Sequence, residues 1–226
     1  MATETAPSSR PVGGRADKRE SIIRGAMAVF AEEGYTRASI DAIAKRAGVS
    51  TRTIYNHFRD KPELFHVTIM TSTNGVGDAI SALIERHFHK VTDVEADLNA
   101  FGFDLVTSKG EFSAHFAMMQ QVKTEWAHVP AEAARLWREA GPRRVNNELA
   151  AKLSELDAKG LLRVENPQQA AKHLQTLVWG SLPIDFDLAA TPESEIAAHV
   201  ASGVRVFLYG YAAPSELPVA SGSASS

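Results

Sequence analysis

The chain has 226 residues, of which 44% are hydrophobic and 23% charged, values that are ordinary for a globular protein with a sizeable core. It contains no cysteine, which excludes disulfides, thiolate metal sites and cysteine nucleophiles, and no apolar run long enough to predict a transmembrane helix. The formal net charge of -3 divides into +3 for residues 1–65 and -6 for the remainder, which fits a DNA-binding head on an acidic body.

The first segment, residues 1–15, is predicted to be a disordered basic tail because it is rich in Ser, Thr, Pro, Gly and Ala. It has no apolar core of the kind found in secretory signals, and a cytoplasmic location is expected. The four cations around its end either contact DNA or are simply solvated side chains of a chain terminus. These cations are Arg10, Arg15, Lys18 and Arg19. A first helix is predicted from Ala16 to Glu33, where Gly34 stops it.

Residues 38–65 carry the pattern of a helix-turn-helix. Ser39 can cap a short helix, Gly48 suits the position after its end, and Ser50 can cap a second helix. Ile54 and Phe58 give that second helix one inward face. Two short helices around a tight turn predict insertion into a DNA groove.

The remaining chain is also predicted to be helical. Asp60 and Glu63 form a capping-box pattern, so a long helix should start near Lys61 and kink or break around residues 74–77. Further helical patterns cover 95–107, 111–127 and 131–140; Gly141 and Pro142 then interrupt, and another helix runs to about Lys159. The last two patterns cover 167–182 and 191–211, and residues 212–226 read as a disordered tail. The prediction is an all-α protein of about nine helices, with a three-helix DNA-binding domain at 16–60 and a larger ligand-binding and dimerisation domain at 61–211.

The segment from Arg19 to Phe65 resembles the DNA-binding domain of the tetracycline-repressor (TetR) family of bacterial regulators. The matching motifs are residues 22–30, 34–35, 39–44 and 47–50, with Tyr55, His57, Phe58, Lys61, Glu63 and Leu64. More loosely, residues 160–162, 166–167, 170–171 and 180 resemble the AefR-like C-terminal domains of that family. The resemblance implies an Ω-shaped homodimer that represses transcription and leaves its operator when a small molecule binds.

With Ile54 and Phe58 buried, the second helix of the motif should expose the residues that reach DNA. Arg52 and Asn56 are four apart and share a face, so we expect them to read bases, since Arg grips guanine and Asn grips adenine. A phosphate contact or a solvated position is the alternative for each. The other predicted DNA contacts are Ser39, Ser50, Thr51, Thr53, Tyr55, His57 and Lys61; for Tyr55, His57 and Lys61 the resemblance implies phosphate contacts.

The last two helices are predicted to pair two copies as an intersubunit four-helix bundle, although an ordinary core of one chain is the alternative. The proposed interface consists of Leu174, Leu177, Val178, Val200, Val204, Phe207 and Tyr211. Large apolar side chains in the body are either core or the lining of a ligand pocket. The pocket candidates are Phe101, Phe112, His115, Phe116, Met119, Trp126 and Trp179, and they favour a hydrophobic or aromatic ligand.

Other functions are less compatible with the sequence. No phosphate-binding glycine loop or G-x-S-x-G motif occurs, so we expect no enzyme. His87 and His89 are two apart, unlike the i, i+4 pair of a helical zinc site, and no metal or other cofactor is expected. The partners expected are an operator in double-stranded DNA, a second copy of the chain and a small effector, with no membrane. A DNA-binding architectural protein without a ligand is the main rival, and activation rather than repression stays open.

Overall fold

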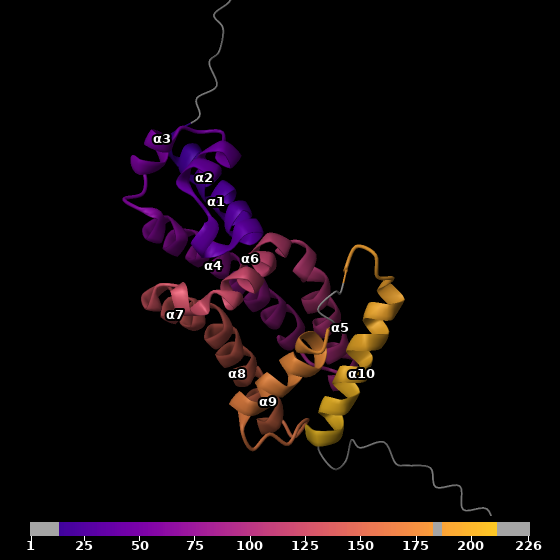
Figure 1. Ribbon diagram of the computed structural model, residues 1–226. Coiled ribbons are helices and arrows are strands. Elements are labelled where there is room, and N and C mark those ends of the chain that lie inside the picture. Colours follow the sequence, from indigo (N-terminus) through magenta and orange to yellow (C-terminus); the bar gives the residue numbers. More distant parts are fainter. Residues whose placement is uncertain (1–13, 183–186, 212–226) are drawn as a thin grey trace, which may run out of the picture. The chain divides into compact units, whose positions relative to one another are not determined.

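The computed structural model describes residues 14–182 and 187–211, and within these ranges the regular elements are helices with no strand (Figure 1). The all-α prediction is confirmed. The predicted tails lie outside the described residues, apart from Gly14 and Arg15. In chain order the elements are α1 (Arg15–Arg37), α2 (Ile40–Ala47), α3 (Thr51–Tyr55), α4 (Lys61–Phe88), α5 (Val94–Thr107), η1 (Ser108–Gly110), α6 (Ser113–Thr124), η2 (Trp126–His128), α7 (Ala131–Arg138), η3 (Glu139–Arg143), α8 (Arg144–Ala158), α9 (Pro167–Gln175), η4 (Thr176–Gly180) and α10 (Glu193–Tyr211).

The described residues form two compact units. The first contains the residues up to Ile69 together with Ala117–Pro130, and the second contains Met70–Phe116 together with the residues from Ala131 onward. The first unit thus holds the predicted 16–60 domain and two segments, 61–69 and 117–130, that were expected in the larger domain. None of the helices described is long and apolar enough to cross a membrane.

The first unit is organised around an aromatic cluster. The rings of Phe30 and Phe65 meet edge to face with centroids 5.1 Å apart, and the ring of Tyr35 lies 4.6 Å from that of Phe65. Helices α1 and α2 approach closely at Gly25. A Cβ atom at this position would lie only 2.9 Å from the Cβ of Ala47, so the contact requires glycine. This core fixes α2, and with it the turn that leads to α3.

Glycines mark two boundaries that the sequence predicts, whereas a third possible boundary is absent. Gly34 has φ +80° and ψ 177°, so the helical backbone is interrupted there, as expected. Gly48 has φ +67° and ends α2. Around Gly75 and Gly77, in contrast, α4 runs on from Lys61 to Phe88 without the possible break, and Val76 and Leu83 are buried on its inner face.

The second unit packs α5, α8, α9 and α10 around one hydrophobic core. Two glycines permit the close approach of α10. A Cβ on Gly203 would lie 2.5 Å from the carbonyl oxygen of Leu177, and one on Gly102 would lie 2.6 Å from a methyl group of Val200. Gly141 and Pro142, expected to interrupt the chain, instead lie in the π-helical turn η3 that joins α7 to α8.

Candidate nucleic-acid interface

The turn between α2 and α3 is closed by hydrogen bonds at each helix end. Ser39 Oγ accepts from the backbone N–H of Ala42 at 3.1 Å, and Ser50 Oγ accepts from the N–H of Thr53 at 3.1 Å. Between the caps, the N–H of Val49 donates to the carbonyl of Ala44 at 3.0 Å across the left-handed Gly48. Both predicted caps and the predicted turn glycine are therefore observed, and they orient α3 as the second helix of a helix-turn-helix.

Helix α3 separates buried from exposed residues as its pattern predicts. Ile54 and Phe58 are 1% and 2% exposed, whereas Arg52, Tyr55 and Asn56 are exposed. The remaining residues predicted on this helix to contact DNA are half-buried. These residues are Thr51, Thr53 and His57.

Arg52 and Asn56 lie one helical turn apart on the surface. The backbone N–H of Asn56 donates to the carbonyl of Arg52 at 3.0 Å, which keeps the two residues in helical register although α3 itself ends at Tyr55. No ion pair engages Arg52 within the described ranges. Its guanidinium and the Asn56 amide are thus both available for pairs of hydrogen bonds to a purine edge.

The side chains of Ser50 and Thr53 also bond to each other, with Oγ and Oγ1 2.8 Å apart. A serine hydroxyl that accepts from a cap N–H keeps its own proton for a second partner, so Ser39 retains a donor for a phosphate oxygen. At the start of α4, Glu63 N–H donates to Asp60 Oδ1 at 2.8 Å and Glu63 Oε2 accepts from the N–H of Arg59 at 2.6 Å. The predicted capping box is present, with its return bond one residue earlier than expected.

Lys61 is half-buried rather than free on the surface. Its Nζ donates to the carbonyl of Thr36 at 3.1 Å and lies 4.9 Å from the centre of the Tyr35 ring. Burial lowers the pKa of the Lys61 ammonium, and the nearby Glu125 and Glu33 carboxylates oppose that shift. The Lys61 ammonium thus links the start of α4 to the end of α1. One of its three N–H donors is used in this bond, and the others can reach a phosphate.

Three other cations of the first unit are engaged with neighbouring side chains. Arg46 is held by Glu32 through two hydrogen bonds of 2.8 and 2.6 Å, which keep the pKa of that carboxyl below its usual value. Arg59 is paired with Asp60 at 3.0 Å. The guanidinium of Arg19 lies 5.3 Å from the centre of the Phe58 ring and so joins α1 to the base of α3.

The predicted ligand residues do not form one group. In the second unit His115 and Phe116 stack edge to face at 5.2 Å, and the Phe116 ring lies 5.1 Å from that of Trp179. Phe101 instead packs against Phe88 in the core, and Phe112 is half-buried without a ring contact in the described chain. Met119 and Trp126 belong to the first unit, where Met119 is buried and the side chain of Trp126 lies outside the described residues.

Most of the predicted dimer residues are already buried within one chain. Five of them are at most 1% exposed and belong to the core of the second unit: Leu174, Val178, Val200, Val204 and Phe207. Leu177 and Tyr211 are half-buried. The face of α10 that remains exposed carries Val206 and Tyr209, 55% and 64% exposed, which the sequence analysis did not select. The helical period of apolar residues predicts which face of α10 is apolar, but it does not predict which element covers that face.

Histidines are scattered in the structure, and within residues 14–182 and 187–211 no three His, Asp or Glu side chains lie together as metal ligands would. His87 Nε2 lies 2.8 Å from Asp104 Oδ2, and His115 Nδ1 lies 2.9 Å from Ser72 Oγ. Each of these contacts is accounted for by packing between neighbouring helices of the second unit.

The fold and the α2–α3 turn define a helix-turn-helix DNA-binding protein. Two family models match the chain: bacterial regulatory proteins of the tetR family over residues 22–68, and the C-terminal domain of AefR-like transcriptional repressors over residues 104–213. The chain belongs to the TetR family and is a transcriptional regulator rather than an enzyme.

Individual relatives agree with this assignment. The regulator BetI of Yersinia pestis is 31% identical over 174 residues, which cover 75% of this chain and 81% of BetI. The regulator AcrR of Shigella flexneri is 28% identical over 47% of this chain and 56% of AcrR, so the match spans about half of that relative. The structure of the flavonoid-responsive regulator FrrA superposes with a TM-score of 0.62 at 29% identity, over 87% of this chain and 98% of FrrA.

Proposed function

We propose that this TetR-family regulator is a homodimeric repressor that binds a palindromic operator and is released by a small hydrophobic or aromatic ligand. The observation that carries the DNA-binding part is the exposed pair Arg52, on α3, and Asn56, at its C-terminal cap; the two are one turn apart, and Ser50 caps the start of the helix. Two heads related by a two-fold axis would read two half-sites, which is why a palindrome is expected. Ser39, Thr51, Thr53, Tyr55, His57 and Lys61 are assigned supporting contacts, mainly to phosphates.

Dimerisation is assigned to the exposed side of α10. Val206 and Tyr209 are three residues apart, so they lie on one face of the helix and present two large apolar side chains to solvent. The same face of a second copy is complementary to it in an isologous two-fold contact. The half-buried Leu177 on η4 can extend this contact, whereas the buried core residues of α9, η4 and α10 hold the face in shape.

The ligand is assigned to the cluster of His115, Phe116 and Trp179. The rings of this cluster offer an apolar surface, and because His115 Nδ1 lies 2.9 Å from Ser72 Oγ, the Nε2 atom is the nitrogen left for a ligand. Burial lowers the pKa of His115 to about 4, so its imidazole is neutral at pH 7 and suits an uncharged partner. FrrA, a relative in structure, is described as flavonoid-responsive, which favours the same class of planar aromatic effector.

Selection of bound fragments from genomic DNA tests the proposal. The expected result is a short palindromic sequence bound by the dimer, with binding weakened when planar aromatic compounds are added. Recovery of DNA without any shared sequence would favour a DNA-binding architectural protein and contradict the proposal. Transcription from a promoter that carries the operator then separates repression from activation, since the sign depends on where the operator lies.

A further inference from the structure

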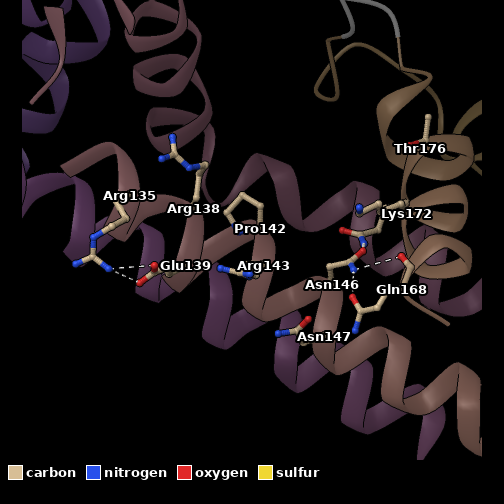
Figure 2. A pocket seen from close by; sticks show the side chains of 11 residues that line it. Arg135, Arg138, Glu139, Pro142, Arg143, Asn146, Asn147, Gln168, Lys172 and Thr176 are labelled. Atoms are coloured by element: carbon tan, nitrogen blue, oxygen red, sulfur yellow. Dashed lines mark hydrogen bonds and ion pairs between the residues drawn. The ribbon is translucent and has the colours of Figure 1, made fainter. Parts of the chain in front are cut away.

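A wide polar groove opens on the second unit, and its lining includes none of His115, Phe116 and Trp179. It lies between α7 with η3 on one side and α9 with η4 on the other, over the start of α8, and has a volume of about 870 Å³ (Figure 2). This volume is within the range of small-molecule sites in proteins. Figure 2 shows Arg138 and Arg143 on the α7–η3 side and Lys172 on the α9 side.

The charge of this groove is opposite to that of the chain. Four cations line it, Arg135, Arg138, Arg143 and Lys172, against the single acid Glu139, which gives a formal balance of +3 in a chain of net charge -3. Glu139 accepts from Arg135 Nη1 at 3.0 and 2.9 Å through both carboxylate oxygens, and Arg135 also pairs with Glu132 at 2.6 Å, so Arg135 adds no net positive charge to the groove. Unbalanced positive charge in a concave site concentrates anions from solution.

Arg143 and Lys172 carry most of this uncompensated charge. Both side chains are exposed, and neither takes part in an ion pair within residues 14–182 and 187–211. They come from opposite sides of the groove, one from the end of η3 and one from the middle of α9. A ligand with two acidic groups could therefore engage both at once, and the planar Arg guanidinium suits carboxylate or phosphate oxygens.

Hydrogen bonds between side-chain amides link α8 to α9 at this groove. Asn146 on α8 is 8% exposed, and its Nδ2 donates to Gln168 Oε1 at 2.6 Å, while its Oδ1 accepts from Gln175 Nε2 at 3.1 Å. Gln168 and Gln175 flank Lys172 on the same face of α9 and its continuation. These amide bonds hold α8 against α9, so the backbone positions that carry the cations are set before any ligand arrives, which reduces the entropy cost of binding.

We infer that this groove binds a small anion with two acidic groups, a dicarboxylate or a diphosphate, held between Arg143 and Lys172. The site is separate from the aromatic ligand cluster and from α3, and it does not rest on either of those assignments. A ligand that binds only the folded protein raises its melting temperature in a saturable way. Occupation of the groove would thus give the regulator a second, chemically distinct signal.

Thermal-shift titration and calorimetry with pyrophosphate, succinate and the uncharged succinamide test this inference at constant ionic strength. We expect a saturable response to at least one of the two anions and none to succinamide. Arg143→Ala and Lys172→Ala should each weaken that binding about tenfold or more, as expected when one charged hydrogen-bonding partner is lost. Lys159→Ala, which removes an equally exposed cation at the far end of α8, is the matched control and should bind as the wild type does.

Equal affinity in all three variants, or a response that does not saturate, would overturn the inference. A loss of dimer in Arg143→Ala and Lys172→Ala, measured by light scattering, would do so as well, because it would make the groove an interface between copies. Operator binding without added anion should be unchanged in both variants. A negative anion titration would therefore leave the DNA-binding proposal intact, and the two failures can be told apart.

Discussion

The carboxylate of Glu125 accepts a hydrogen bond of 2.8 Å from the backbone N–H of Thr36, a residue 89 positions earlier in the chain. The contact lies within the first unit and closes the turn between α1 and α2. The hydrogen bond from the Thr36 backbone is the main reason that the pKa of Glu125 lies below its usual value. A backbone bond from Tyr35 adds to this effect, and burial opposes it. On the same turn, Lys61 donates to the Thr36 carbonyl. Glu125 and Lys61 thus fix both backbone groups of Thr36.

Removal of this carboxylate should loosen the head. We expect Glu125→Ala to lower the free energy of unfolding by about 1 kcal/mol, since the lost hydrogen bond is charge-assisted but half-exposed. The stability of Glu125→Gln should lie between those of Glu125→Ala and the wild type, because the amide oxygen of Gln still accepts a hydrogen bond. Urea unfolding at pH 7 measures both. Glu111→Ala removes an exposed acid in the second unit and is the control; if it costs as much as Glu125→Ala, the contact adds no stability.

Two glycines with positive φ provide a matched comparison of strain with and without steric conflict. Gly34 adopts φ +80° and ψ 177°, a region almost restricted to glycine, and an added Cβ would lie 2.7 Å from Glu125 Oε1. Gly48 adopts the milder left-handed conformation and has open space around it. Gly48→Ala should therefore cost about 1 kcal/mol, and Gly34→Ala at least about 2 kcal/mol, in thermal or urea unfolding. The reverse order would contradict this account.

Features set by neighbouring residues could be predicted from the sequence. The caps at Ser39 and Ser50, the turn at Gly48 and the inward pair Ile54 and Phe58 each depend on a few adjacent positions, and all are observed. Local propensity alone predicts a possible break of α4 near Gly75. A glycine costs a helix only about 1 kcal/mol, which the burial of neighbouring side chains such as Val76 offsets.

Features that depend on distant partners could not be predicted. The apolar period of α10 identifies Val204 and Phe207 as one face, but it does not tell whether a neighbouring helix or a second copy covers that face. The contact of Glu125 with Thr36 joins residues far apart in sequence and leaves no local pattern. The same holds for the cationic groove, because Arg143 and Lys172 line one groove only when α8, which follows η3, packs against α9.

Two substitutions in the DNA-binding head should differ in kind. Arg52→Ala removes a proposed base contact, so it should cost about 1–3 kcal/mol on the operator and leave binding to random DNA almost unchanged. Lys61→Ala removes a proposed phosphate contact and should weaken all sequences alike, lowering the salt slope by about one. Fluorescence anisotropy at several salt concentrations measures both effects. Equal losses for Arg52→Ala on operator and random DNA would refute its role in base reading.

The exposed apolar pair on α10 should control assembly. Tyr209→Glu places a charge in the proposed contact between two copies, and we expect it to shift the protein from dimer to monomer in light scattering, with unchanged helix content by circular dichroism. Ala151→Glu adds the same charge to an exposed position of α8 and should leave the dimer intact. A dimer that persists in both Tyr209→Glu and Val206→Glu would exclude this face as the interface.

The buried imidazole of His115 should make stability depend on pH. Its side chain is 7% exposed and its pKa is lowered to about 4 by burial, whereas the unfolded chain binds this proton near pH 6.5. Between these values the unfolded state holds more protons, so the free energy of unfolding should fall as the pH drops, by up to about 1.4 kcal/mol per pH unit from this group. Urea unfolding at pH 7, 6 and 5 measures the slope. His115→Gln should reduce it, and His128→Gln, at an exposed position, should not. An unchanged slope in His115→Gln would show that other groups control the acid sensitivity and that His115 is not held neutral.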